Sequence, residues 1–278
     1  MVDSVSLSPS TRLTLLERIE IARERDEASN RLATGQRATR ISDDPQDFLR
    51  ASALSARVNS LLDAKANIGQ AISSLETAQI GLEAVEKLGE QLKGIAYAAQ
   101  SATGAEKDAL IAQFDVTRQQ LDKLVGDVSY QGSNLISSPP DSQRVNLNDQ
   151  PGSDLTVDGQ ASDVASLNVG SATADYNNFA TIPDIETAIA AVDDALSAVR
   201  ANASRIGNNA AILTTRETFT QDLANSLQDG ADDLLKADIN LEGARLLAAN
   251  VRGDLGLAGQ RITARSESLI VDLVRGGQ

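Results

Sequence analysis

RLATGQRATRISDDPQDFLRASAL, residues 31–54, contains the signals that end one helix and begin another. Gly35 follows a polar run with helical spacing, and glycine is the commonest residue just beyond a helix C-terminus. Asp44, Pro45 and Asp47 then supply an N-cap, a first helical residue and a first-turn acid, which together are typical of a helix start. The stretch therefore predicts two helices joined by a short loop.

Proline is absent from two long windows, 46–138 and 184–278, which are therefore free to be helical. In the first window, apolar residues recur every seven positions up to Leu82 and then at steps of three and four. A break at 101–109 precedes a second run with apolar spacing. This pattern predicts a hairpin of two helices packed along an apolar seam. The seam positions are Leu54, Leu61, Ile68, Leu75 and Leu82.

The second window has an apolar heptad series that continues from Ile185 to Leu269. One unbroken helix over 184–275 would be about 140 Å long, and we expect a break or bend near Gly230. Five positions before that break complete the intrachain seam: Ile185, Val192, Val199, Ile206 and Leu213. The expected fold class is mainly α, with long coiled-coil helices from both termini forming an elongated bundle.

Residues 137–182 have a different composition, rich in Ser, Asn, Asp, Gly and Thr. Three short pieces with alternating polarity (144–147, 155–157 and 167–169) are flanked by turn residues, so we expect small β-hairpins and loops here. The N-terminal segment 10–34 has helical spacing but a thin apolar stripe, so this helix is expected to be marginal in isolation.

The chain has no cysteine and no histidine. This excludes disulfides, the usual zinc sites, histidine acid–base catalysis and Ser-His-Asp triads. Paired acids at 43–44, 193–194 and 232–233 are better explained as helix caps and solvated faces than as catalytic carboxylates. The glycine-rich stretch 253–259 lacks the spacing of a phosphate-binding loop, and the glycosylation sequon at 202–204 lies in the middle of an expected helix. We therefore expect no enzyme activity and no cofactor.

The formal net charge of −14 disfavours nucleic acid and anionic membranes as partners. No run approaches the roughly 20 apolar residues of a membrane span, and the N-terminus has no apolar segment typical of a cleaved secretory signal. Aromatic residues are only 3% of the chain, which favours helix-on-helix seams over a round core. The terminal helices have apolar stripes but no large core to cover. We therefore expect them to pair with each other and with other copies of the chain.

Three separated stretches resemble bacterial flagellin, the filament protein of the flagellum. Residues 31–54 resemble the family's R-L-[ST]-[ST]-G-x-R…DD segment. Residues 119–136 (QQLDKLVGDVSYQGSNLI) resemble its passage from the second core-domain helix into a β-region, and 234–275 (beginning LLKADINLEGARLL) resemble its C-terminal helix. The resemblance is to a short form of the family, because 137–182 is too short to hold large outer domains.

The resemblance implies a division of the chain into two concentric layers. Residues 1–42 and 232–278 are expected to form an inner coiled coil, whereas 43–136 and 183–231 form an outer helical bundle with 137–182 as its β-region. Self-assembly through the inner helices is expected to use Leu13, Leu16, Ile19, Leu32, Leu241, Ala248, Leu255, Ile262 and Leu269. The linker between the layers is expected to contain Gly35, Asp43, Asp44 and Pro45.

The implied function is that of a structural subunit that polymerises into the helical flagellar filament used for swimming. The implied partners are other copies of the chain, the flagellar cap and hook-associated proteins, and an export chaperone that binds the C-terminal helix. The implied location is extracellular, in the filament, after export without a cleaved signal peptide.

The chain departs from the family's pattern in two places. Many flagellins carry an R-x-R-E-L stretch that an animal innate immune receptor reads, and the equivalent here is a degenerate stretch containing Gln91, Lys93 and Gly94. The triplet at 43–45, Asp-Asp-Pro, is also frequent in the homologous hook–filament junction protein, which is the first alternative; residues 234–275 favour flagellin. The second alternative is a soluble coiled-coil adaptor or secreted protein.

Overall fold

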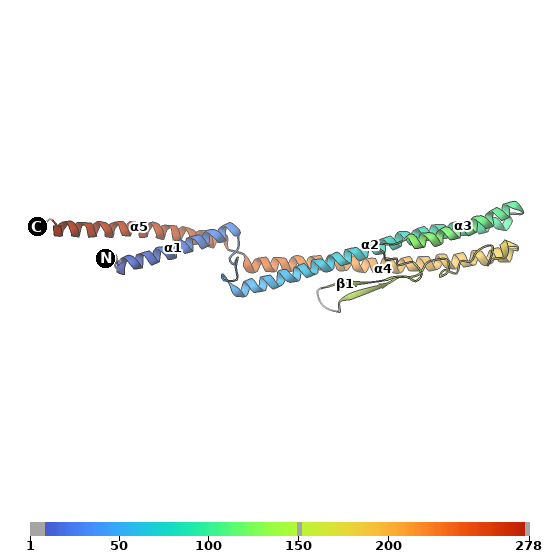
Figure 1. Ribbon diagram of the computed structural model, residues 1–278, viewed down its shortest axis with the longest axis horizontal. Helices are drawn as coiled ribbons and strands as arrows, with labels where there is room; N and C mark the ends of the chain where they lie inside the picture. Colours follow the sequence, from blue (N-terminus) through green and yellow to red (C-terminus); the bar gives the residue numbers. More distant parts are fainter. Residues whose placement is uncertain (1–8, 149–151, 276–278) are drawn as a thin grey trace, which may run out of the picture. The chain divides into compact units, whose positions relative to one another are not determined.

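The computed structural model describes residues 9–148 and 152–275, and the side chains of all of these except 9–11, 263–264 and 267–275. In chain order, the elements are α1 (Pro9–Thr34), α2 (Pro45–Ser101), α3 (Ala105–Asp127), β1 (Ser142–Asn146), β2 (Asp154–Asp158), the short 3-10 turn η1 (Asn177–Phe179), α4 (Ile182–Leu235) and α5 (Ile239–Arg275) (Figure 1). The prediction of a mainly α fold with long helices and a small β-region is confirmed.

The chain divides into two compact units, which are described separately below. Unit 1 contains the described residues of 1–55 and 227–278, and unit 2 contains those of 56–226. Both expected inner segments, 1–42 and 232–278, belong to unit 1, and the expected β-region belongs to unit 2. Their arrangement as concentric layers stays a prediction.

The helix boundaries at the opening stretch follow its local chemistry. Gly35 has φ +68°, and its N–H donates to the carbonyl of Arg31 over 2.9 Å, so α1 ends with a left-handed residue. Asp44 caps α2, because the Asp47 N–H donates to its Oδ1 over 3.1 Å. The predicted stop and start are therefore confirmed, and Pro45 is the first helical residue of α2.

The expected break near Gly230 is wrong by a few residues. α4 continues through Gly230 to Leu235, and the chain is non-helical only at 236–238 before α5 begins. A single interior glycine costs only about 1 kcal/mol relative to alanine, which packing of a long helix can offset. Asp238 supplies a stronger signal, since its Oδ1 accepts the N–H groups of Asn240 and Leu241 and so caps α5.

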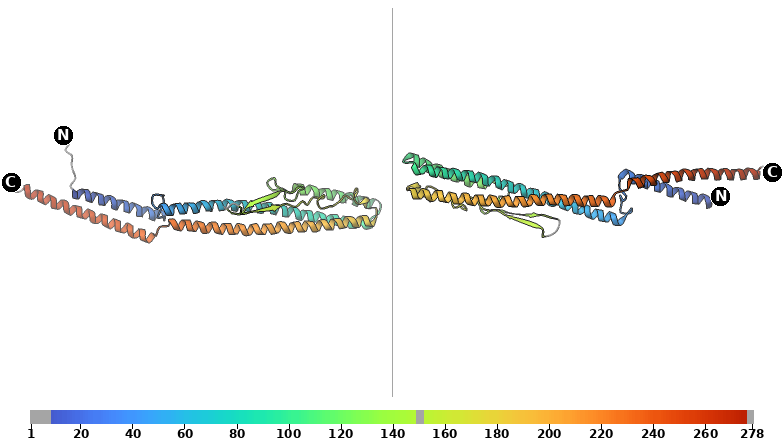
Figure 2. Two further views of the ribbon diagram at one scale, coloured as in Figure 1. Left: turned by 90° about the horizontal axis from the view of Figure 1, so that it is seen from below. Right: turned by 180° about the vertical axis from the view of Figure 1, so that it is seen from behind.

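In unit 2, α2, α3 and α4 pack together along the predicted apolar positions, and Figure 2 shows α2 and α4 side by side in both views. Leu54, which belongs to unit 1, is half-buried. The remaining nine seam residues are at most 3% exposed: Leu61, Ile68, Leu75, Leu82, Ile185, Val192, Val199, Ile206 and Leu213. At roughly 1.5–3 kcal/mol for each fully buried aliphatic side chain, this seam contributes strongly to the stability of unit 2.

The β-region forms one hairpin that packs on the helices. β1 and β2 are antiparallel, and Val145 and Val157 turn into the core cluster. The expected third piece, 167–169, is not a strand. Leu167 and Val169 are buried, but their N–H groups donate to Asp163 and Val164 within a turn. The polarity alternates here because the side chains of Leu167 and Val169 reach the core from a turn. Among the described residues, no strand pairs with this segment.

An aromatic cluster closes the core beside the start of α4. Phe114 lies edge-on to Phe179 and Tyr176, with ring centroids 5.4 Å and 6.3 Å away. Asn177, Asn178 and Phe179 all have positive φ, a costly conformation for a bulky residue such as phenylalanine. Complete burial of the Phe179 ring offsets this strain.

A matched pair of leucine truncations on α2 tests whether the apolar seam stabilises unit 2. Leu82 is 1% exposed and Leu62 is 41% exposed. We expect Leu82→Ala to lower the free energy of unfolding by about 2–5 kcal/mol, because it leaves a cavity. Leu62→Ala changes it by less than about 0.5 kcal/mol. Urea denaturation followed by circular dichroism measures both, and equal losses would contradict the seam.

Candidate functional site

The candidate residues for assembly lie on α1 and α5, which pair within unit 1 (Figure 1). The two helices are antiparallel, with Arg31 opposite Glu242 near the linker and Glu24 opposite Arg252 further along. Their buried contact residues are small or charged: Ala28, Glu242 and Ala249. The pair therefore buries little apolar area, in contrast to the seam of unit 2.

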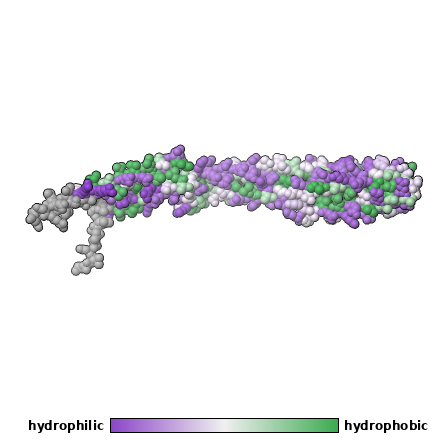
Figure 3. Space-filling view, turned by 90° about the horizontal axis from the view of Figure 1, so that it is seen from above, coloured by the Kyte–Doolittle hydropathy of each residue, from purple (hydrophilic) through white to green (hydrophobic). Residues whose placement is uncertain are grey.

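Most of the predicted self-assembly residues lie outside this contact and are exposed. The exposed members are Leu13, Leu16, Ile19, Leu241, Ala248, Leu255 and Ile262, whereas Leu32 is partly buried. The side chain of Leu269 lies outside the described residues. Figure 3 shows apolar surface over the part of the molecule where α1 and α5 lie. Exposed apolar surface on this scale is typical of a protein interaction site.

Three further residues belong to the same apolar surface but were not predicted. Leu15 on α1 and Leu247 and Leu257 on α5 are exposed. The predicted positions form one stripe along each helix, and Leu15, Leu247 and Leu257 lie outside these stripes. A helix that is apolar over more than one narrow stripe needs a partner on more than one side. That breadth is the sequence signal that could have found them.

The linker is held by backbone pairing between its two chain segments. Gln36 and Lys236 form an antiparallel bridge, the Ala237 N–H donates to the Gly35 carbonyl over 2.9 Å, and the Arg37 N–H donates to the Leu235 carbonyl over 2.6 Å. The segment after α1 and the segment after α4 are therefore joined directly where each leaves its helix.

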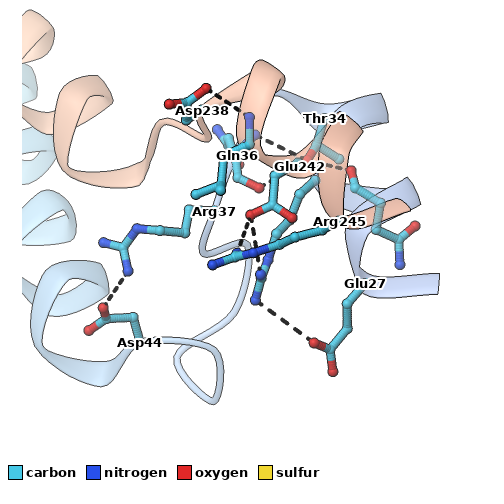
Figure 4. A network of polar contacts seen from close by, with 11 residues as sticks. Glu27, Thr34, Gln36, Arg37, Asp44, Asp238, Glu242 and Arg245 are labelled. Atoms are coloured by element: carbon cyan, nitrogen blue, oxygen red, sulfur yellow. Dashed lines mark hydrogen bonds and ion pairs between the residues drawn. The ribbon is translucent and has the colours of Figure 1, made fainter. Parts of the chain in front are cut away.

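Arg37, which the sequence did not single out, holds the start of α2 against the end of α4 (Figure 4). Its guanidinium donates to Asp44 over 2.7 Å, to Asp47 over 2.5 Å and to the Leu234 carbonyl over 3.1 Å. The hydrogen bond from Arg37 is the main reason that the pKa of Asp44 lies below its ordinary value of 3.8. In the sequence, Arg37 is followed by Asp44 and Asp47, the two acids that it contacts, but nothing nearby indicates its contact with the Leu234 carbonyl.

The predicted linker residues each have a local role. Asp43 accepts hydrogen bonds from the N–H groups of Arg40 and Thr39 and so closes the loop before α2. These two hydrogen bonds, of which the one from Arg40 has the larger effect, are the main causes that lower the pKa of Asp43. Gly35 and Asp44 terminate and cap helices as described above, and Pro45 is exposed at the first position of α2. These roles are polar and local, and they accompany the burial of Ala38 and Ala237 in the linker.

Two of the features weighed above as candidate sites make contacts within the chain. Asp193 pairs with Lys93 over 2.6 Å, and Asn202 of the sequon is buried and donates to Ser162. Within residues 9–148 and 152–275, no group of three potential metal-ligating side chains occurs. The described helices also include none with the length and hydropathy of a membrane span.

The degenerate receptor stretch lies on α2 in unit 2. Gln91 and Gly94 are exposed, whereas Lys93 is half-buried by its ion pair with Asp193 and lies 5.8 Å from the centre of the Tyr97 ring. The only positive charge of this stretch is therefore already paired within the chain.

Substitution of Arg37 tests the polar clamp through pH. Because the pKa of Asp44 is depressed in the folded state, the stabilisation it contributes is complete above its ordinary value of 3.8 and is lost as pH falls through the folded pKa. In Arg37→Gln, we expect the pKa of Asp44 to rise towards 3.8, measured by carboxyl NMR titration. Arg50→Gln is the control, since Arg50 lies 3.9 Å from Asp47 and has no ion pair with Asp44 among the described contacts. An unchanged Asp44 pKa in Arg37→Gln would refute the clamp.

Comparison with known proteins finds similarity to bacterial flagellins. A family model described as the bacterial flagellin N-terminal helical region matches residues 12–139. The chain is 25% identical to flagellin FljO of Caulobacter vibrioides, over 99% of both chains, and 26% identical to a flagellin of Brucella melitensis biotype 1, over 97% of this chain and 99% of that one. The structure of a putative flagellar hook-associated protein from Vibrio parahaemolyticus shares the fold, with a TM-score of 0.58 and 14% identity over 70% of this chain and 100% of that one. Over nearly its full length, the chain is therefore similar to curated bacterial flagellins, and residues 12–139 match the N-terminal helical region of that family.

Proposed function

We propose that this chain is a structural subunit that polymerises into the filament of a bacterial flagellum. One observation carries the proposal: α1 and α5 expose a series of large apolar side chains that unit 1 does not cover. Other copies of the same chain are the occupants that fit, because the relatives that match nearly the full length are flagellins.

Polymerisation covers the apolar surface that a single copy leaves exposed. A face of one copy that fits a different face of the next makes a head-to-tail contact, and such contacts build helical polymers when they do not close into a ring. Because α1 and α5 bury little apolar area against each other, their order increases when neighbouring copies pack on them. Ordering and assembly are then one coupled step.

The hook–filament junction protein is the nearest alternative. The fold shared with a putative hook-associated protein does not favour either function, since that likeness has only 14% identity. The curated relatives over nearly the whole chain are flagellins, which favours the filament. A soluble adaptor would expose the same apolar helices without a self-assembly partner and would stay monomeric.

Further features of this function follow from the family. The filament is extracellular, export needs no cleaved signal peptide, and the subunit has no enzyme activity. Its partners include hook-associated and cap proteins at the filament ends and an export chaperone that binds α5. Gln91 and Gly94 replace charged residues of the stretch that an innate immune receptor reads in other flagellins, which disfavours recognition of this chain.

Filament formation tests the function directly. We expect purified chain, seeded with short polymer fragments, to form filaments visible by electron microscopy. Deletion of about 40 residues from either end removes α1 or α5 and abolishes filaments, whereas circular dichroism still reports a soluble helical protein, because the seam of unit 2 is intact. A truncated chain that still polymerises would refute the assignment.

Charged substitutions on α5 test the surface without truncation. We expect Leu255→Glu and Ile262→Glu, at residues 66% and 70% exposed, each to reduce polymer yield at least tenfold in a sedimentation assay. A buried unpaired carboxylate costs several kcal/mol, and every copy in the polymer would carry one. Asn250→Glu is the matched control, since it adds the same charge to an exposed polar position of α5. If the Leu255→Glu and Ile262→Glu variants both assembled normally, this face of α5 would be excluded as an assembly surface.

A further inference from the structure

The contact between α1 and α5 has a defined register, that is, particular residues of the two helices lie opposite each other. Its buried apolar residues are alanines, and a Cβ added to Gly253 would lie 3.7 Å from Ile21, so the helices meet through small groups. Interlocking large side chains fix the register of ordinary helix pairs, whereas contacts between alanine and glycine fix it only weakly. Some other interaction must select the observed alignment.

Glu242 is the polar residue buried in this contact. Its side chain is 3% exposed, and its Oε1 accepts from Arg245 over 2.6 Å and from Arg31 of α1 over 3.5 Å (Figure 4). Its other oxygen, Oε2, is buried and has no hydrogen-bond partner among the described residues. Glu242 thus depends on two arginines, and Arg31 is the one that belongs to the opposite helix.

Other registers would remove the α1 partner of Glu242. A slide of one heptad places Glu242 opposite Glu24 in one direction and opposite Ala38, beyond the end of α1, in the other. A slide of one helical turn places it near Glu27 or near Thr34. In each of these registers Glu242 keeps Arg245 of its own helix but loses its arginine partner on α1. Where it stays buried opposite Glu24 or Glu27, it also faces a like charge, which adds to the desolvation penalty. The charge of Glu242 therefore favours the observed register, most strongly over those that bury it opposite an acid.

The second ion pair between the helices lacks this property. Arg252 donates to Glu24 over 2.6 Å, but both side chains are about half exposed. Solvent screens such a pair and can replace either partner, so its loss carries little penalty. The two pairs thus differ in burial although they join the same helices.

We propose that Glu242, through Arg31, determines the register of the α1–α5 pair. This role concerns alignment within one chain and differs from the covering of apolar surface that drives assembly. Glu242 lies in the first turn of α5, next to the hydrogen-bonded linker, so alignment is set where the pair begins. The inference rests on the proposed function only in that neighbouring copies complete the order of the pair.

Disulfide trapping can measure the register, because the chain has no cysteine of its own. Ile21→Cys with Gly253→Cys reports the observed register, since these positions are in contact. Ile21→Cys with Leu246→Cys, or with Gln260→Cys, reports slides of one heptad in the two directions. Each pair is oxidised in the full chain, both in solution and after seeded polymerisation, and the cross-linked fraction is measured on gels.

The expected result is a redistribution of cross-links. With Glu242 present, the Ile21→Cys, Gly253→Cys pair dominates; Glu242→Gln raises the off-register fraction at least threefold. Arg31→Gln does the same, which keeps the test valid if one variant folds poorly. Arg252→Gln, the exposed control, leaves the distribution unchanged.

Two outcomes would overturn the proposal. One is an unchanged distribution in both Glu242→Gln and Arg31→Gln. The other is a shift in Arg37→Gln with none in Glu242→Gln, which would assign the register to the linker. Electron microscopy of the same samples reports filaments separately, so failure of polymerisation and failure of the register assignment are distinguishable.

Discussion

A long amphipathic helix must bury its apolar face along its whole length, and the two units of this chain differ in how far they do so. In unit 2, three helices and a hairpin surround one seam, and its leucines and isoleucines are almost completely buried. In unit 1, the main parts are two helices, and each can cover only one side of the other. The heptad period of α4 continues into α5, yet Leu213 is buried and Leu255 is exposed. The number of helices around the seam, and not the pattern itself, makes the difference.

The linker joins these helices by polar contacts. Its order comes from Arg37 and the acids around it, from the Asp43 loop and from the backbone bridge between Gln36 and Lys236. Such bonds are short-range and directional, so they fix the local path of the chain with little burial of apolar surface. This suits a segment between a self-sufficient bundle and a helix pair that needs other copies.

Much of the fold could be predicted from the sequence because its signals are local. Gly35, Asp44 and Pro45 indicate helix ends through their own backbone or side-chain preferences, and apolar spacing identifies which face of each helix is apolar. The sequence could not tell what covers that face, so it did not separate buried Leu213 from exposed Leu255. The break before α5 was misplaced because Gly230 is a weak signal, whereas the Asp238 cap is strong. Roles that depend on distant partners were missed: Arg37 needs the Leu234 carbonyl, and Glu242 needs Arg31.

The composition of the α1–α5 contact separates affinity from alignment. A seam of large apolar residues would make this pair stable alone, but it would use the leucines and isoleucines that face outwards. Alanine and glycine leave those residues available, at the cost of a contact that many registers could satisfy. One buried carboxylate restores selectivity, because it loses its arginine partner on α1 in a register one turn or one heptad away. A subunit that orders on assembly benefits from this division: neighbours supply the stability, and the chain itself determines which alignment they stabilise.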